Sequence, residues 1–477
     1  MANHQIFVAG TWEESPQKLD VTNPYDGSLV GTTYSASEEQ YERAVQAALD
    51  VTPVLAAEPA FERSRRLRFV ADEIEARKEE IGEVIAREAG KPLKDAISEA
   101  SRGGFTFRVA AEEAERMYGE LIPLDLNEAS KGRTGITRKF PIGPVAGISP
   151  FNLPLGLAAH KVAPAMAAGC PIVLKPPSAA PLTMLMVAEI IERSGAPAGA
   201  VSVMPMSRAI GDKLVEDDRF KLLTFTGSPQ VGWPMKARAG KKRVVLELGG
   251  NAAAVVDATA DVKHAAQRCA YGAFKYAGQL CISVQRIFVH EAVWDDFSND
   301  FALRVSELRQ GDPMDLTTDL GPLIDDGAAA QTEEWIQEAV DAGAVLLAGG
   351  KREGRLIEPT VLTDVPPQLR VCREEAFAPV VVLEKVTDFS EALARVNDSD
   401  FGLQAGIFTN DLGHAWRAFH ELEVGGVVIN DAPTYRIDHM PYGGVKDSGF
   451  GREGLRWAIE DMTEIRILVM PNTATRS

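Results

Sequence analysis

The sequence predicts an α/β protein built on open parallel sheets, and three observations support this class. From about Pro144 onward, short apolar runs recur, each followed by Gly, Pro or Ser and then by a stretch of helical periodicity. With 477 residues, the chain is too long for one compact core, so two or three domains are expected. Hydrophobic residues make up 45% and charged residues 25%, as in soluble globular proteins.

The order of the elements follows from these patterns. Residues Phe61 to Ala89 read as one long amphipathic helix, which Gly90-Lys91-Pro92 ends. A polar segment, Gly132–Arg138, and a terminal strand, Ile465–Met470, are candidates for a projecting arm. The candidate strands between them are Val145–Ile148, Ile172–Leu174, Val201–Met204, Leu222–Phe225, Val244–Leu246, Ala253–Val256, Ile287–His290, Val345–Leu347, Val380–Leu383, Ala405–Thr409 and Val427–Asn430. A second α/β unit therefore begins near Leu248.

Charge and cysteine content exclude several classes of protein. A net charge of −18 and a pI of about 5.0 disfavour nucleic-acid and anionic-membrane partners, because no broad basic surface opposes phosphates. The chain start lacks a basic region followed by an apolar core, and no run of about 18 apolar residues is present, so neither a signal peptide nor a membrane span is expected. The cysteines show no CxxC pair and no metal-like spacing with His, so a reducing, cytoplasmic compartment and no metal are expected; they are Cys170, Cys269, Cys281 and Cys372.

Cys281, in Gly278-Gln279-Leu280-Cys281-Ile282-Ser283, and Glu247, in Glu247-Leu248-Gly249-Gly250-Asn251, are the most informative pair of residues. A thiolate is a strong nucleophile that forms thioesters, and a carboxylate in the same pocket can activate water to release them. Together they indicate acyl chemistry on an aldehyde. By itself, a Cys between apolar neighbours is more often a buried small hydrophobe.

Three strand ends carry polar groups that suit a ligand. Gly227 and Ser228 follow the candidate strand Leu222–Phe225, where a helix start would present free N–H groups to a phosphate. Lys175 ends another strand, where it could bond ribose hydroxyls, and Asn152 lies in a Pro-flanked turn that suits an oxyanion donor. Taken singly, each is more often an ordinary turn residue or a solvated Lys.

Seven motifs in order then identify a resemblance. They are SPFNLP, KPPS, FTGS, LELGGN, GQLCIS, EEAFAPV and PYGGVKDSGFGREG, which fall between about residues 140 and 455. The chain resembles the NAD(P)-dependent aldehyde dehydrogenase superfamily, with lactaldehyde and succinate-semialdehyde dehydrogenases as the nearest types. The resemblance implies two Rossmann-like open parallel-sheet domains and a small β arm for oligomerisation. The expected parts are a dinucleotide-binding domain (1–120 and 142–247), a catalytic domain (248–454) and the arm (121–141 and 455–477).

The resemblance assigns catalytic roles. Cys281 would attack the aldehyde carbon, and Asn152 with the backbone N–H of Cys281 would hold the oxyanion. Hydride would pass to NAD or NADP, and Glu247 would activate the water that releases the thioester. Lys161 and Glu453 resemble a proton path behind Glu247.

The cofactor contacts are also implied by the resemblance. Glu375 and Phe377 would contact the nicotinamide ribose and ring, Lys175 the adenine ribose and Ser228 the pyrophosphate. Further expected contacts are Ser149, Phe151, Ser178, Gly211, Gly227 and Leu248. NAD-preferring members often carry a Glu where this chain has Ser178, and a carboxylate there would repel a 2′-phosphate. We therefore expect NADP to be accepted as well as NAD.

The substrate is expected to be a short hydroxyaldehyde or semialdehyde. Leu153, Leu157 and His160 follow Asn152 at helical spacing, and His160 stands where an aromatic residue often lines the pocket for apolar aldehydes. Arg436 or His439 could bind an anionic tail. Two plainer interpretations stay open: His160 bonded to its own helix neighbours, and Arg436 paired at the surface with Asp438 or Asp431. Other expected substrate contacts are Ile282, Tyr435 and Tyr442.

Alternatives in other classes remain open at this point. A coenzyme A-acylating enzyme would keep the fold but would not need Glu247. A non-catalytic family member would be a binding or structural protein, since fold does not imply function. A cysteine hydrolase would need a His base, which no motif supplies. An exposed arm strand would need a partner, so a homodimer or homotetramer is expected.

Overall fold

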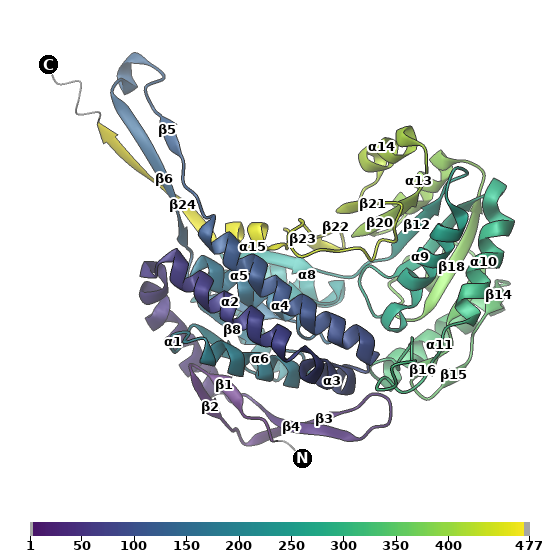
Figure 1. Ribbon diagram of the computed structural model, residues 1–477, viewed down its shortest axis with the longest axis horizontal. Helices are drawn as coiled ribbons and strands as arrows, with labels where there is room; N and C mark the ends of the chain where they lie inside the picture. The colour runs from purple at the N-terminus through teal and green to yellow at the C-terminus, as the bar shows by residue number, and fades with distance from the viewer. Residues whose placement is uncertain (1–2, 472–477) are drawn as a thin grey trace.

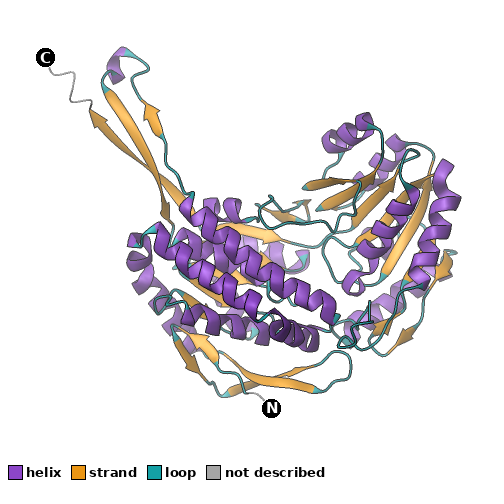
Figure 2. Cartoon of the chain, viewed as in Figure 1, coloured by secondary structure: helices purple, strands orange, loops and turns teal. Residues whose placement is uncertain are grey.

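The computed structural model describes residues 3–471. Two large sheets, each covered by helices, stand side by side, and a three-stranded sheet projects far from the rest (Figure 1). Helices and strands alternate along most of the chain, as Figure 2 shows. The α/β class predicted from the apolar runs is confirmed.

The first sheet has eight strands in the order β2-β1-β9-β8-β7-β10-β11-β23. Its five central strands, β9 to β11, are parallel, while the pairs β2-β1, β1-β9 and β11-β23 are antiparallel. The strands are β1 (Ile6–Val8), β2 (Thr11–Glu13), β7 (Val145–Ile148), β8 (Ile172–Lys175), β9 (Val201–Val203), β10 (Leu222–Thr226), β11 (Arg243–Glu247) and β23 (Gly449–Phe450).

Two separate apolar layers cover the faces of this sheet, so its central strands are buried on both sides and read as continuous apolar runs. The helices of one face are α2 (Ala60–Ala76), α3 (Lys78–Ala89), α4 (Leu93–Glu115), α5 (Gly156–Ala168), α6 (Leu182–Arg193) and α15 (Leu455–Asp461). Those of the other face are α1 (Glu38–Ala57), α7 (Arg208–Glu216) and α8 (Pro229–Arg238).

The single helix predicted over residues 61–89 is wrong in one respect, because the structure breaks it into α2 and α3. Arg77 leaves helical geometry (φ −113°, ψ 18°), and its N–H caps α2 by bonding the carbonyls of Glu73 and Ile74. Both helices pack on α4 in a different direction, which keeps Leu67 and Ile81 buried. No Gly or Pro stands at the break, so the sequence gives no signal for it. The predicted end is confirmed: Gly90 is a left-handed C-cap.

The second sheet has seven strands in the order β14-β17-β18-β13-β12-β20-β21, all parallel except the edge pair β14-β17. Its strands are β12 (Ala252–Val256), β13 (Val284–His290), β14 (Val345–Ala348), β17 (Thr360–Thr363), β18 (Val380–Val386), β20 (Gln404–Phe408) and β21 (Gly426–Ile429). The helices around it are α9 (Val262–Phe274), α10 (Trp294–Ser306), α11 (Asp326–Asp341), α12 (Arg370–Arg373), α13 (Phe389–Asn397) and α14 (Leu412–Glu421).

The arm is an antiparallel sheet in the order β24-β6-β5, formed by β5 (Leu121–Pro123), β6 (Arg133–Pro141) and β24 (Thr463–Pro471). Both segments proposed for an arm are therefore strands. α15, just before β24, packs on α4 and α5. The domain boundaries stay predictions. The remaining elements are β3 (Gln17–Thr22), β4 (Leu29–Ser35), β15 (Arg352–Glu353), β16 (Leu356–Ile357), β19 (Phe401–Gly402), β22 (Val445–Lys446) and the short helices η1 (Glu128–Ser130), η2 (Lys275–Gly278) and η3 (Glu291–Val293).

The fold places the carboxyl ends of β7, β8, β10 and β11 at one edge of the first sheet, because these strands are parallel neighbours. Ligands of open α/β sheets bind at this edge. Within residues 3–471, no helix is long and apolar enough to cross a membrane. The same residues contain no group of three or more His, Cys, Asp or Glu placed to hold a metal ion.

Candidate active site

A cavity of about 350 Å³ lies between the carboxyl ends of β7 and β10 and the loop that carries Cys281. Its size is within the range of small-molecule sites. It brings together residues predicted for three roles: Asn152 and Cys281 for catalysis, Glu375 and Phe377 for the cofactor, and Leu157 for the substrate. The other lining residues are Pro150, Phe151, Thr226, Gly227, Ser228, Leu248 and Gly249.

Cys281 lies on a tightly turned loop between η2 and β13. Tyr276 and Ala277 adopt left-handed backbone angles, with φ of 50° and 52°, which non-glycine residues rarely do. Gly278 follows with φ 71°, and a Cβ there would lie 2.1 Å from the carbonyl oxygen of Ala378. Only glycine fits that position, so the loop geometry that presents the thiol depends on it.

The side chain of Gln279 holds the loop that carries Cys281, a role that was not predicted from the sequence. Its side chain is buried; Nε2 donates to the carbonyl of Pro322 (3.2 Å), and Oε1 accepts from the N–H of Ile324 (3.0 Å). Asn152 Nδ2 donates to the backbone carbonyl of Gln279 (2.9 Å). One amide hydrogen of Asn152 thus orients the side chain, and the second is left for a ligand.

The surroundings of Cys281 disfavour ionisation of its thiol. Burial, together with the nearby carboxylates of Glu247 and Glu375, raises the pKa of the thiol to about 12. Two groups act in the opposite sense: Tyr442, whose Oη lies 3.2 Å from Sγ, and the guanidinium of Arg436. Cys281 is thus a thiol at rest whose ionisation depends on a few identified neighbours.

Glu247 is the last residue of β11 and is almost completely buried. Among the described residues, neither carboxylate oxygen has a hydrogen-bond partner. Burial raises its pKa well above the usual value, and repulsion from Glu453 adds to this, while Arg436 and Lys161 act against it. A buried carboxylate with free lone pairs and a raised pKa has the properties of a general base.

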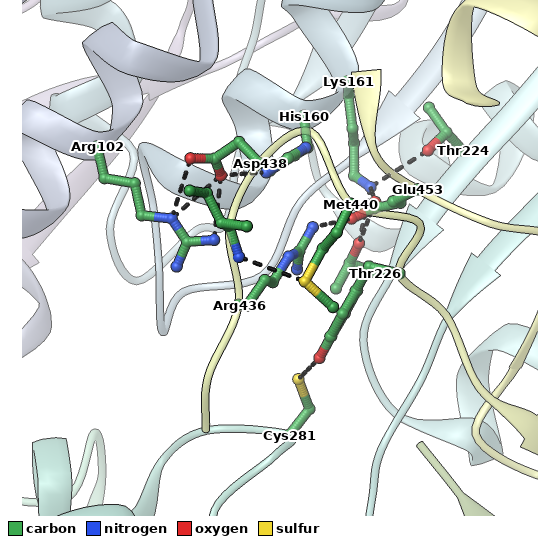
Figure 3. A network of polar contacts seen from close by, with 12 residues as sticks. Arg102, His160, Lys161, Thr224, Thr226, Cys281, Arg436, Asp438, Met440 and Glu453 are labelled. Carbon is green, nitrogen blue, oxygen red and sulfur yellow. Dashed lines mark hydrogen bonds and ion pairs between the residues drawn. The ribbon is translucent and has the colours of Figure 1, made fainter. Parts of the chain in front are cut away.

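Glu453, whose charge acts on Glu247, is the centre of a buried charge cluster. Figure 3 shows this cluster with Lys161 and Arg436. Lys161, from α5, binds Glu453 Oε1 (3.1 Å) and donates to Thr226 (2.7 Å) and Thr224 (3.2 Å). Arg436 binds Oε2 through Nη2 (3.0 Å). Although burial raises the pKa of Glu453, Lys161 and Arg436 outweigh it and hold the pKa at about 2. Lys161 and Glu453, predicted as a proton path, are in direct contact.

The plainer interpretation of Arg436 is wrong. A surface pair with Asp438 or Asp431 was the favoured alternative, but the Arg436 side chain is 7% exposed and pairs with Glu453. Asp431 instead pairs with Arg268 (2.5 Å). The loop between β21 and β22 folds inward here because Glu453 offers a buried carboxylate, a partner that local spacing does not reveal.

Asp438 joins two helices of the first unit to this loop (Figure 3). His160 Nε2, on α5, lies 2.9 Å from Asp438 Oδ1, and Arg102 Nη2, on α4, lies 3.0 Å from it. The alternative in which His160 bonds within its own helix is therefore wrong. Burial and then Arg436 lower the pKa of His160, so it is neutral. Arg102 was missed, because an Arg within a long amphipathic helix carries no distinguishing signal.

The nicotinamide side of the cavity is shaped by close backbone approaches. Glu375 accepts a hydrogen bond from the N–H of Gly250 (2.9 Å), and a Cβ on Gly249 would lie 2.2 Å from its carboxylate. Burial raises the pKa of Glu375 to about 7. Phe377, with φ 49°, meets Phe151 edge-on at 6.0 Å between ring centres. A carboxylate and an aromatic wall suit a ribose and a flat ring.

The adenine side fits the other half of a dinucleotide. Lys175 is half-buried, and its stem packs on Gly211, where a Cβ would lie 3.1 Å from Lys175 Cδ. Ser178 is exposed. Ser228 is the exposed N-cap of α8, and its side chain makes no capping bond. The helix start is therefore open to a pyrophosphate. Ser149 Oγ is buried and has no partner among the described residues.

The remaining residues predicted for the substrate divide into two groups. Ile282 and Tyr442 are buried together with Leu403 around Cys281. Leu153 is half-buried beside Gly156. Tyr435 is 49% exposed and His439 is exposed, so the structure does not bring these two into the buried cluster.

These features define a dinucleotide-dependent oxidoreductase with a cysteine nucleophile. The chain belongs to the aldehyde dehydrogenase family, whose model matches residues 12–468.

Three similar proteins are informative. A 3-sulfolactaldehyde dehydrogenase from Priestia aryabhattai is 43% identical over 466 residues, which are 98% of this chain and 97% of the relative. Aldehyde dehydrogenase 21 from Physcomitrella patens, solved in complex with the reaction product succinate, superposes with a TM-score of 0.97 at 48% identity and covers 99% of both chains. An NADP-dependent glyceraldehyde-3-phosphate dehydrogenase from Bacillus halodurans, solved with NADP, gives 0.96 at 38% identity and covers 99% of this chain and all (100%) of that one.

Proposed function

We propose that this NAD(P)-dependent aldehyde dehydrogenase oxidises a short aldehyde with a carboxylate or sulfonate tail, with Cys281 as nucleophile and Glu247 as general base. The observation that carries the proposal is the shared cavity, in which Cys281, Asn152, Glu375 and Phe377 meet. Trapping the protein with aldehyde and oxidised cofactor and weighing it tests the proposal. The expected result is an acyl adduct on Cys281, and undiminished turnover of Cys281→Ser would refute it.

Each residue has a defined task in the reaction. The Cys281 sulfur attacks the aldehyde carbon, and the free amide hydrogen of Asn152 with the Cys281 N–H binds the oxygen as it becomes an anion. The nicotinamide, when bound, supplies the hydride acceptor. Glu247 then takes a proton from water as the water attacks the thioester, and its raised pKa makes it a stronger base. Lys161 and Glu453 lie behind it to receive and release that proton.

The cations around the cavity support an anionic substrate. With a net charge of −18, the protein as a whole repels anions, so local cations must recruit them. Arg102 and the neutral His160 bind Asp438, Arg436 binds Glu453 and lies against the Tyr442 ring beside Cys281, and Leu157 supplies an apolar wall of the cavity. The relatives named for sulfolactaldehyde and solved with succinate act on or bind small anions. A panel of C2 to C6 aldehydes, with and without an anionic tail, tests this. A preference for long alkyl or aromatic aldehydes would reject it.

We propose that NADP is accepted as well as NAD, because Ser178 is exposed and uncharged, three residues after Lys175, the proposed contact to the adenine ribose. The neighbour from Bacillus halodurans was solved with NADP. The ratio of kcat/KM for the two cofactors is the measurement, and a preference for NAD greater than about 100-fold would contradict the proposal.

The four free thiols support the cytoplasm as the compartment.

A homodimer or a tetramer of dimers is the proposed assembly. Ile465 and Ile467 on the projecting β24 are exposed, and so are Leu412, Trp416 and Phe419 on α14. The two surfaces lie on opposite sides of the molecule, so they do not cover each other within one copy (Figure 1). Contiguous exposed apolar residues indicate an interface, and a two-fold arrangement would cover both at once. Light scattering after size exclusion measures the assembly.

Coenzyme A as the acyl acceptor is the competing function. Such an enzyme needs no base to activate water, whereas Glu247 is buried at a cost and has no structural partner among the described residues. A buried carboxylate without a structural partner therefore favours hydrolysis of the thioester over transfer of the acyl group to coenzyme A. A rate that rises with coenzyme A and yields the acyl thioester would reverse this choice.

A further inference from the structure

Tyr442 is held rigidly beside the nucleophile. Its backbone forms two hydrogen bonds with Glu453: N–H to carbonyl at 3.0 Å and, in return, carbonyl from N–H at 2.6 Å. Its side chain is 2% exposed and packs with Ile282 and Leu403. The Tyr442 ring is therefore held in a fixed position relative to Glu453, which binds both Lys161 and Arg436.

The Tyr442 hydroxyl points at the reacting sulfur. Oη lies 3.2 Å from Cys281 Sγ. Within residues 3–471, the sulfur is the one hydrogen-bond partner of this hydroxyl. Burial raises the pKa of Tyr442 well above its usual value, so the phenol keeps its proton. A buried O–H donates where an acceptor exists, and here the acceptor is the sulfur.

Arg436 lies against the face of the Tyr442 ring, with the guanidinium carbon 3.7 Å from the ring centre. A cation over a phenol ring withdraws electron density and makes the hydroxyl a better donor. Arg436 keeps this position because Glu453 binds its Nη2.

The charged and titratable groups that face Cys281 are Glu247 at the end of β11, Glu375 before β18, and Tyr442 and Arg436 from the loop between β21 and β22. Both carboxylates and the burial itself oppose ionisation of the thiol. Among these groups, Tyr442 and Arg436 are the two that favour it. A nucleophile in this setting needs them.

We propose that Tyr442 is a catalytic residue that activates the nucleophile, because its hydroxyl donates a hydrogen bond to the Cys281 sulfur and stabilises the thiolate, with Arg436 stacked on its ring to strengthen the donor. The inference rests on the proposed role of Cys281 in the reaction. When the aldehyde is attacked, the S–H proton passes to the proposed base Glu247, the S–C bond forms, and the electron pair of the carbonyl π bond moves to the aldehyde oxygen. The hydrogen bond stabilises the sulfur while it carries negative charge.

The test is the pH dependence of alkylation at Cys281 in the full-length enzyme without cofactor. Iodoacetamide labelling is followed by mass spectrometry at the Cys281 peptide from about pH 6 to about pH 10. For Tyr442→Phe, the apparent thiol pKa is expected to rise by about one unit, so the labelling rate below the pKa falls about tenfold. Tyr25→Phe, the same change at an exposed position, is the control and leaves the profile unmoved. An unmoved profile for Tyr442→Phe overturns the proposal.

A second variant separates the hydrogen bond from packing. Replacement of Tyr442 by 3-fluorotyrosine keeps the ring and makes the hydroxyl more acidic, so the thiol pKa is expected to fall instead of rise. A rise in both variants would mean disturbed packing and would overturn the proposal. Labelling measures the reactivity of the Cys281 thiol and does not depend on turnover. Undiminished turnover by Cys281→Ser would therefore refute Cys281 as the nucleophile of the reaction, whereas the measured effect of Tyr442 on the thiol pKa would still hold.

Discussion

Arg436 and Glu453 form a buried ion pair, with Nη2 and Oε2 3.0 Å apart and side chains 7% and 3% exposed. Lys161 occupies the other carboxylate oxygen at 3.1 Å, so two cations meet one anion. The cluster therefore carries a net positive charge that faces Glu247 and, through the Tyr442 ring, Cys281. It favours the anionic forms of the base and the nucleophile, which burial alone would suppress.

Glu247→Gln is expected to separate the two halves of the reaction. Glutamine keeps the shape and cannot take a proton from water, so thioester hydrolysis slows while hydride transfer continues. We expect a burst of reduced cofactor of one equivalent per site, followed by a steady-state rate at least about 100-fold lower. Stopped-flow absorbance measures both phases. Glu79→Gln on the exposed face of α3 is the control, and a normal steady-state rate in Glu247→Gln would mean that another residue is the base.

The same substitution is expected to stabilise the fold. The folded pKa of Glu247 is raised above the unfolded value, so the folded protein binds an extra proton between the two pKa values. The native carboxyl thus destabilises the fold increasingly as pH rises from about 4.5 towards the folded pKa. Glu247→Gln removes this cost, by about 1–3 kcal/mol at neutral pH. Urea unfolding at several pH values measures it, and a gain that persists below about pH 4 would contradict the titration.

Local patterns were sufficient for the strands and for the chemistry on them. The apolar run at 145–148 is β7 without a change of boundary, since a strand buried on both faces has nothing but apolar residues to show. Asn152, Cys281 and Glu375, each recognised by its own short motif, line one cavity: Asn152 follows β7 of the first sheet, whereas Cys281 and Glu375 precede β13 and β18 of the second. These features depend on residues close in sequence.

The sequence did not predict which charged residues pair when they are far apart along the chain. A surface pair of Arg436 with Asp438 or Asp431 was one alternative, but its partner is Glu453, which lies between β23 and α15. His160 binds Asp438 from far along the chain, and Arg102 joins them from α4. Because a buried charge is stable only when it is paired, the tertiary fold decides which residue is its partner. The spacing of residues in one sequence does not show that partner.

Arg102→Met is expected to weaken anionic substrates selectively. The guanidinium lies at the end of the site beside Asp438 and can reach a carboxylate or sulfonate tail, whose charge-assisted bond contributes about 1.5–3 kcal/mol. We therefore expect kcat/KM for succinate semialdehyde to fall about 10- to 100-fold and that for propanal to change less than about threefold.

Arg108→Met is the matched control, since Arg108 lies on the same helix and pairs with Asp72 at the surface (2.6 Å). Both variants lose one positive charge. Equal losses for the anionic and the neutral aldehyde in Arg102→Met would show that the Arg supports the fold and not the substrate tail.

Ser178→Glu is expected to change the cofactor preference. A carboxylate beside Lys175 would accept a bond from the 2′-hydroxyl of NAD and repel the 2′-phosphate of NADP. The ratio of kcat/KM for NADP over NAD should fall by about 10-fold or more. Initial rates with each cofactor measure it. Ala179→Glu places the same charge at the next exposed position, and an equal effect there would assign the change to general repulsion.

Ile465→Lys is expected to weaken the proposed assembly. Ile465 is 70% exposed on β24 and stands on the same strand face as Ile467. If a second copy covers this face, a buried ammonium there should raise the dimer dissociation constant by about 10-fold or more. Light scattering at a series of protein concentrations measures it. Glu464→Lys points to the opposite strand face and is the control; an unchanged dissociation constant in Ile465→Lys would place the interface elsewhere.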